Sequence, residues 1–133
     1  MSMQPKIVDN PGRGAMLNTR LEGPFRLSVD GIDFAIRRRS AGAFALGGLD
    51  RQGRFCLSRV GRADRDLSQE LRNFIGSESL FKFAYARDGV EAFLRECELF
   101  HRFRPQANFW HPTRPAGTRI LCPYCLNSRA DAD

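Results

Sequence analysis

The amino-acid sequence predicts a small α+β domain in which helices flank a mixed or antiparallel β-sheet. The chain has 133 residues, which is enough for one hydrophobic core and too few for two. Segments in which every second residue is apolar alternate along the chain with segments of helical apolar spacing. We therefore expect a single domain at residues 23–126, between a flexible N-terminal arm at 1–22 and a disordered tail at 127–133.

The first predicted element is a β-hairpin at residues 25–36. The apolar segments FRLSV and IDFAI flank Asp30-Gly31, and glycine readily takes the positive φ that a two-residue turn needs. This hairpin would precede the rest of the sheet.

A second hairpin is predicted from GAFALG at 42–47 and RFCLSRVG at 54–61, which are joined by a turn rich in glycine and aspartate. Strict alternation in its second strand would place Phe55, Leu57 and Arg59 on one face. An arginine would then occupy a position where a buried apolar residue is expected.

A helix and a strand follow this hairpin. Asp66 is suited to cap the helix, and Gly76 is suited to end it. Its apolar side is formed by Leu67, Leu71, Phe74 and Ile75. The segment LFKFAYA at 80–86 alternates large apolar residues with Lys82 and small residues, which predicts a half-buried strand.

The longest helix is predicted between Asp88 and Pro105. Asp88 can cap it, Glu91 can complete a capping box, and Pro105 ends it. One apolar stripe facing the core is expected from Val90, Phe93, Leu94, Cys97, Phe100 and His101. Glu96 lies at the edge of this stripe, so it is either a boundary residue or a functional carboxylate directed into a cleft.

The net charge of +6 is concentrated in residues 37–65, which hold eight arginines and only two aspartates. A focused positive field favours a polyanion such as DNA or RNA, whereas solvated surface charges are the alternative interpretation. The predicted nucleic-acid-binding residues are Arg37, Arg38, Arg39, Arg54, Arg59, Arg62 and Arg65.

The sequence has no apolar segment of membrane-spanning length and no N-terminus of signal-peptide type, which predicts a cytoplasmic protein without a membrane partner. In a reducing compartment, the four cysteines are expected to be thiols or metal ligands before disulfides.

Cys122-Pro-Tyr-Cys125 has the spacing of a zinc knuckle and supplies two of four ligands. The other two are expected among Cys97, His101 and His111, of which the first two are four residues apart on one helix face. A structural Zn²⁺ would tie the long, irregular C-terminal segment to the helix. The alternative is a buried Cys97, a core His101 and a metal-free CPYC.

Residues 42–108 resemble the GIY-YIG endonuclease superfamily. Gly42-Ala43-Phe44 is similar to its Gly-Ile-Tyr motif, and Arg59-Val60-Gly61 is similar to its Tyr-Ile-Gly motif. Glu96 resembles the metal-binding glutamate of the family, and Asn108 resembles its late asparagine. The resemblance implies a β-β-α-β-α fold and hydrolysis of nucleic-acid phosphodiesters by a tyrosine-assisted water, an arginine and one Mg²⁺ or Mn²⁺ ion on the glutamate.

Three catalytic positions of the family carry different chemistry here. Phe44 lacks a hydroxyl group, Arg59 replaces the second tyrosine, and Glu70 stands where the helix arginine is expected. The loss of one transition-state charge contact typically costs about 100- to 1000-fold in rate. These three changes therefore argue against the family mechanism.

Hydrolysis would require that Arg59, Arg62 or Arg72 reach the phosphate and that Tyr85 supply a phenol. Without such compensation, Glu96 is expected to pair with Arg59 across the degenerate cleft.

The predicted function is a degenerate nuclease-like domain that binds nucleic acid through an arginine-rich face, with weak or no phosphodiester hydrolysis. One alternative is an active, divalent-metal-dependent endonuclease that uses Glu96. Another is a protein-interaction module whose arginine-rich face binds an acidic partner.

Overall fold

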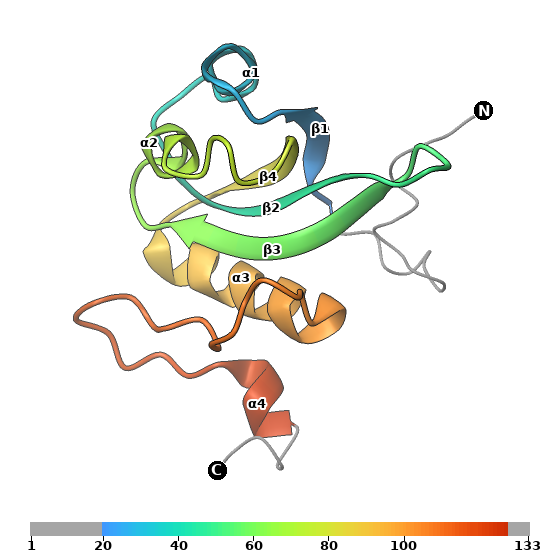
Figure 1. Ribbon diagram of the computed structural model, residues 1–133. Coiled ribbons are helices and arrows are strands. Elements are labelled where there is room, and N and C mark those ends of the chain that lie inside the picture. The colour runs from blue at the N-terminus through green and yellow to red at the C-terminus, as the bar shows by residue number, and fades with distance from the viewer. Residues whose placement is uncertain (1–19, 128–133) are drawn as a thin grey trace.

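The computed structural model describes residues 20–127. Its elements are β1 (Glu22–Arg26), α1 (Val29–Ala35), β2 (Ala41–Leu49), β3 (Phe55–Ala63), α2 (Leu67–Arg72), β4 (Leu80–Ala86), α3 (Gly89–Phe103) and α4 (Pro123–Asn127) (Figure 1). Of the predicted arm at 1–22 and the predicted tail at 127–133, residues 1–19 and 128–133 lie outside the described residues, whereas Glu22 begins β1 and Asn127 ends α4. None of the helices between residues 20 and 127 has the length and apolar character needed to cross a membrane.

The four strands form one antiparallel sheet in the order β1-β4-β2-β3. This arrangement confirms the α+β class and the antiparallel sheet. The consecutive elements β2, β3, α2, β4 and α3 also follow the strand-strand-helix-strand-helix order that the sequence predicts. The central strands are β4 and β2, and β3 forms one edge.

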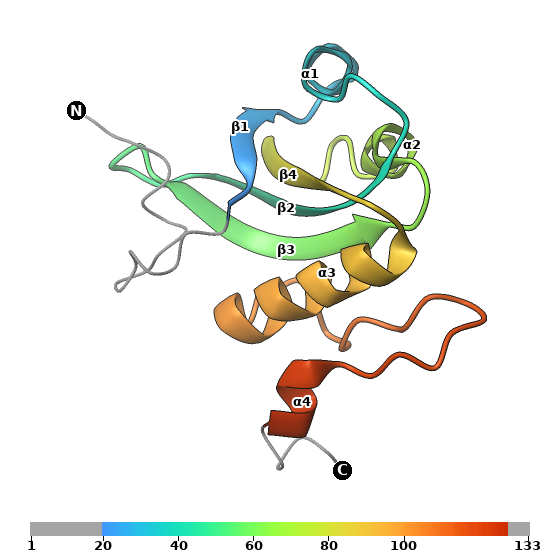
Figure 2. The ribbon, with the colours of Figure 1, turned by 180° about the vertical axis from the view of Figure 1, so that it is seen from behind.

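Helices cover both faces of the sheet, and the alternation along β2 determines which side chains meet which helix (Figure 2). Phe44 and Leu46 belong to the core that α1 and α2 cover. Ala43 and Ala45 belong to the opposite core, where they meet Leu99 of α3. Because alanine is small, α3 can lie close to the centre of the sheet.

The predicted N-terminal hairpin is wrong, because the second half of that segment is the helix α1. Ser28 caps α1, and its side-chain oxygen accepts a hydrogen bond from the backbone N–H of Gly31 at 3.0 Å. Ile32 and Ile36, four residues apart, then share one buried face. Gly31 serves close packing here instead of a turn, since a Cβ atom would lie 2.0 Å from the carbonyl oxygen of Arg26.

The central hairpin is present as β2 and β3, but a β-bulge changes which side chains share a face. The pairing passes from Leu46 opposite Arg59 to Gly47 opposite Leu57, so Ser58 is an extra residue on β3. Leu57 packs toward α3, whereas Arg59 turns to the face covered by α2. The predicted common face of this arginine with the preceding apolar residues is therefore wrong.

The next two elements lie close to their predicted positions. The carboxylate of Asp66 caps α2 by accepting the N–H of Gln69 at 3.2 Å, as the sequence predicts. The helix ends at Arg72, so Phe74 and Ile75 belong to the turn that follows it. β4 spans the predicted residues 80–86.

The helix α3 begins as predicted, because the carboxylate of Asp88 accepts the N–H of Glu91 at 2.9 Å. Its apolar surface is wider than the single stripe that we expected. Leu99 packs against the sheet, whereas Phe93 and Cys97 pack against the C-terminal segment. The helix is thus buried from two directions, and the prediction of one core-facing stripe is wrong.

Replacing Gly47 with alanine should lower the free energy of unfolding by about 1–3 kcal/mol or more. The added Cβ atom would lie 1.9 Å from the carbonyl oxygen of Cys56 at the bulge. Gly48→Ala is the matched control, because its Cβ atom would meet only the Ser79 hydroxyl oxygen at 3.3 Å. Urea denaturation gives the free energy of unfolding of both variants. Equal values for Gly47→Ala and Gly48→Ala would contradict this bulge geometry.

Candidate metal centre and the adjoining cleft

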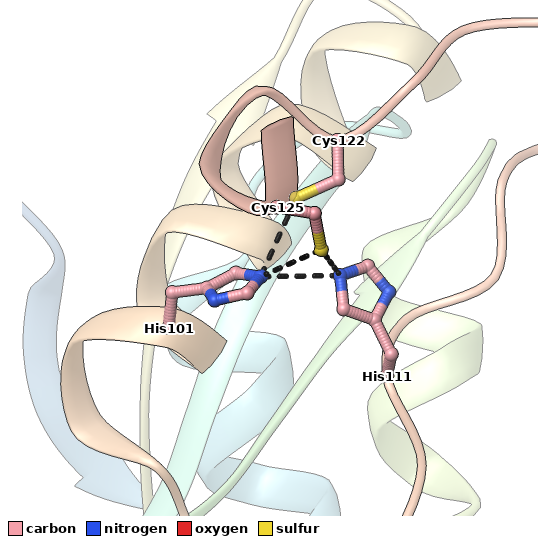
Figure 3. A group of neighbouring side chains, drawn as sticks. All are labelled: His101, His111, Cys122 and Cys125. Carbon is pink, nitrogen blue, oxygen red and sulfur yellow. Dashed lines mark hydrogen bonds between the residues drawn. The ribbon is translucent and has the colours of Figure 1, made fainter. Parts of the chain in front are cut away.

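Four metal-ligating side chains from distant parts of the chain converge beside α3. His101 lies in the last turn of α3, His111 lies in the irregular segment that follows, Cys122 directly precedes α4, and Cys125 lies within α4. Their donor atoms all lie within 4.8 Å of one another, and Figure 3 shows both imidazoles and both thiols directed toward one common point. These four residues could hold a metal ion.

Four of the six distances between the donor atoms fit the edges of a tetrahedron, and all six are within 4.8 Å. His101 Nε2 lies 3.2 Å from His111 Nε2 and 3.4 Å from the Sγ atom of each cysteine. Cys125 Sγ lies 3.3 Å from His111 Nε2. With metal–nitrogen bonds of about 2.0 Å and metal–sulfur bonds of about 2.3 Å, a tetrahedral ion separates its donors by roughly 3.3–3.8 Å. The cluster therefore has the size and donor set of a four-coordinate site.

A hydrogen bond between the His111 ring and the backbone orients this side chain for metal binding. Its Nδ1 atom lies 2.7 Å from the carbonyl oxygen of Pro112. A carbonyl oxygen can only accept, so Nδ1 carries the proton and Nε2 directs its lone pair at the cluster. This arrangement is common among histidines that bind metals.

Sequence spacing alone left five candidates for four positions, and the structure leaves Cys97 outside the cluster. Cys97 is buried with Phe93 and Cys122 in a small apolar core, and this burial raises the pKa of its thiol. His111 takes the fourth position because the segment after α3 folds back along the helix. No spacing rule relates His111 to the CPYC segment, so the sequence could not decide whether Cys97 or His111 is the fourth ligand.

A cleft of about 990 Å³ opens where the end of β3, α2, the start of α3 and the C-terminal segment meet. The six residues that the sequence analysis assigns to a catalytic site all line it, namely Phe44, Arg59, Gly61, Glu70, Glu96 and Asn108. Thr113 and Thr118, which the sequence analysis did not identify, also line it. Both lie between His111 and Cys122, so the segment that forms one wall of the cleft lies between two of the residues that could hold a metal ion.

Glu96 is buried, with 7% of its surface exposed, and it forms an ion pair with Arg62. Arg62 Nη1 lies 2.8 Å from Glu96 Oε1, and Arg62 Nε donates to Asp64 Oδ1 at 2.6 Å. The guanidinium carbon of Arg62 also lies 5.3 Å from the ring centre of Phe93. The expected pairing of Glu96 with Arg59 is wrong, because the bulge places Arg59 on the α2 face and Arg62 on the α3 face.

Burial shifts the charge balance inside the cleft. Desolvation raises the pKa of the Glu96 carboxyl to about 7, although the hydrogen bond and the charge of Arg62 act in the opposite direction. Desolvation also lowers the pKa of Arg62, but its hydrogen bonds to Asp64 and Glu96 outweigh this effect and raise it overall. Burial and the charge of Asp64 raise the pKa of Glu70. The arginine therefore stays charged while the carboxyls resist ionisation.

Asn108 joins the segment after α3 to the edge strand β3. Its Oδ1 atom accepts the N–H of Val60 at 2.8 Å, and its Nδ2 atom donates to the Val60 carbonyl at 3.0 Å. The N–H of Ala107 donates to the carbonyl of Ser58 at 2.9 Å. These bonds cover the sheet edge and position the segment that leads to the metal centre.

Of the four residues expected to compensate for the missing catalytic groups, Arg59 and Arg62 line the cleft, whereas Tyr85 and Arg72 lie outside it. The hydroxyl of Tyr85 accepts the N–H of Arg37 at 2.9 Å, and the guanidinium carbon of Arg38 lies 4.1 Å from its ring centre. Arg72 pairs with Asp33 at 2.6 Å. Neither Tyr85 nor Arg72 lines the cleft.

The predicted nucleic-acid-binding arginines do not form one continuous surface. The cleft is lined by Arg39, Arg59, Arg62 and Arg65, and an adjacent groove is lined by Arg37, Arg38 and Arg39. Arg54 pairs with Asp50 at 3.0 Å at the other end of the hairpin. Eight residues of strand separate Arg54 from Arg62 by roughly 26 Å, so Arg54 lies far from the cleft.

Comparison with protein-family models, curated proteins and solved structures gives no match to this chain. The interpretation of the site therefore depends on its own geometry.

The raised pKa of Glu96 predicts a pH-dependent component of stability. The carboxyl titrates near 4.5 in the unfolded chain and at about 7 in the folded chain. The folded chain binds more protons between these values, so the free energy of unfolding falls as the pH rises through that window. Between pH 5 and pH 7.5, this fall should be about 2 kcal/mol.

Glu96→Gln should lack this component. Urea denaturation of both proteins at the two pH values isolates this component, because the two proteins differ at no other ionisable group. The same pH dependence in the variant and the unmodified chain would show that Glu96 does not titrate as described.

Proposed function

We propose that this chain is a nucleic-acid-binding domain with a degenerate GIY-YIG-like scaffold and weak or no phosphodiester hydrolysis. One observation carries the proposal. Inside a cleft lined by further arginines, the carboxylate that the resemblance assigns to a catalytic cation is already paired with Arg62.

The ion pair argues against hydrolysis assisted by Mg²⁺ or Mn²⁺. Such hard cations need oxygen ligands with available negative charge, and Glu96 Oε1 accepts a hydrogen bond from Arg62 at 2.8 Å. The guanidinium group would also repel a divalent cation placed beside it. Phe44, at the position of the first family tyrosine, has no hydroxyl to assist a water molecule.

The other arginines of the cleft support binding of a phosphate backbone. Arg39 and Arg65 are exposed at its surface. Arg59 is held with its guanidinium carbon 5.5 Å from the ring centre of Phe74, which restricts its motion before a ligand arrives. Guanidinium groups form paired hydrogen bonds with phosphate oxygens, and these contacts position a protein on nucleic acid without reading its sequence.

We further propose that the metal is a structural Zn²⁺. Two thiolates and two imidazoles in tetrahedral spacing are a common structural zinc set, and the set supplies all four ligands from the protein. Residues 104–122 contain no helix or strand, so their order depends on few contacts. Zinc binding would contribute directly to the stability of this segment and of the cleft wall.

Protein purified under reducing conditions should contain one zinc ion per chain, measured by elemental analysis. Cys125→Ser and His111→Ala should lose it, and limited proteolysis should then cut residues 109–121 faster. Cys56→Ser is the matched control, because Cys56 is exposed on β3 and outside the cluster. Retention of zinc in His111→Ala together with its loss in Cys97→Ser would contradict the ligand assignment.

Binding of a labelled oligonucleotide should weaken steeply with salt, because cations are released from the phosphates. Arg59→Ala and Arg65→Ala should each reduce the slope of log K against log salt by about 0.7–0.9. Arg54→Ala, at the far end of the hairpin, should leave the slope unchanged. Fluorescence anisotropy across a salt series gives these slopes.

A nicking assay with Mg²⁺, Mn²⁺ and a chelator separates the alternatives. We expect no metal-dependent cleavage. Cleavage that Glu96→Gln abolishes would instead establish the endonuclease. Absence of salt-sensitive binding, together with a stable complex with an acidic protein, would establish the protein-interaction module.

A further inference from the structure

We infer that Phe109 and Trp110 form a stacking platform for the bases of single-stranded nucleic acid. This inference rests on the proposed function, because it assigns a base-binding surface beside the proposed phosphate-binding cleft.

The first observation is the exposure of two adjacent large aromatic side chains. Phe109 is 83% exposed and Trp110 is 82% exposed, the highest values among the large apolar residues described as exposed. A large aromatic ring loses contact with water favourably when it is buried. Two neighbouring rings that remain outside the core therefore present an apolar surface to a ligand.

The second observation is that the pair is held at both ends. Asn108, immediately before it, makes two hydrogen bonds to the backbone of Val60 on β3. His111, immediately after it, belongs to the metal-ligating cluster. The two aromatic residues are thus displayed on a short segment with fixed ends, which lowers the conformational entropy lost on binding.

The third observation is the position of the pair beside positive charge. Asn108 and Thr113 both line the cleft, so the aromatic residues lie on the segment that borders it. Arg59 and Arg65 line the same cleft. An arginine groove that follows the backbone, together with aromatic rings that stack on bases, is the chemistry by which proteins bind single strands.

This chemistry selects single strands over duplexes and over an apolar protein surface. The base faces of a duplex are already stacked on one another, whereas those of a single strand can stack on aromatic side chains. An apolar protein partner would gain nothing from the adjacent arginines, but a polyanion does.

Trp110 is the only tryptophan of the chain, so its fluorescence reports stacking directly. We expect oligo(dT) and oligo(U) to quench this fluorescence, and an abasic oligonucleotide of equal length and charge to bind without quenching it. Trp110→Ala and Phe109→Ala should each weaken oligo(dT) binding by about 5- to 150-fold, with no change for the abasic strand. Trp110→Phe should restore part of the affinity, because it keeps an aromatic face.

Phe34→Ala is the matched control, because Phe34 is 68% exposed but lies on α1, across the sheet from α3 (Figure 1). It should bind every strand as the unmodified chain does. Circular dichroism and zinc content verify that each variant is folded.

The outcomes distinguish this inference from the proposed function. Salt-dependent binding of oligo(dT) without quenching, and with full affinity in Trp110→Ala, would overturn the stacking platform and leave the proposed function standing. Failure of both oligo(dT) and the abasic strand to bind at low salt would overturn both. Loss of a protein complex in Trp110→Ala, without any effect on nucleic acid, would overturn the platform in favour of a protein interface.

Discussion

The burial of α3 from two directions is the constraint on which the rest of the structure depends. On one side, Leu99 packs against Ala43 and Ala45 of the central strand. On the other side, Phe93 and Cys97 pack against the C-terminal segment. Residues 104–122 form neither helix nor strand, so that segment is positioned by its packing against α3 and by the hydrogen bonds of Ala107 and Asn108 to β3. The cleft wall and the two exposed aromatic residues are positioned in turn by this segment.

The charge in the cleft follows from the same packing. Glu96 is buried at the sheet side of α3, where an unpaired carboxylate would be strongly disfavoured. Arg62 satisfies it, and Arg62 is available because the bulge at Ser58 reverses the alternation of β3. Arg62 therefore neutralises, inside a cleft lined by further arginines, the carboxylate that the proposed resemblance assigns to a catalytic cation. A guanidinium group thus takes the position that the proposed resemblance assigns to a metal cation. For this reason we propose that the chain binds a phosphate backbone without cleaving it.

Local signals in the sequence predicted much of the fold. Asp66 and Asp88 begin helices because each carboxylate reaches a backbone N–H only three residues away, and β4 follows from its alternation. The hairpin at residues 25–36 failed because two local signals competed. Asp30-Gly31 favours a turn, but Ser28 also caps a helix whose isoleucines bury in the core. The burial of Ile32 and Ile36 decided in favour of the helix. This burial cannot be read from the local sequence, because it depends on the assembled sheet.

For the candidate site, the sequence by itself determined the chemical groups: a CPYC pair, two histidines, the carboxylate of Glu96 at the edge of an apolar helix face and a concentration of arginines. The tertiary structure decided which of them meet. His111 displaced Cys97 from the donor set, Arg62 displaced Arg59 as the partner of Glu96, and Phe109 and Trp110 remained outside the core. The physical reason is the distance along the chain over which each kind of interaction acts. Caps and periodicity act over a few residues, whereas these partners are brought together by a bulge, a sheet edge and a segment folded back on α3.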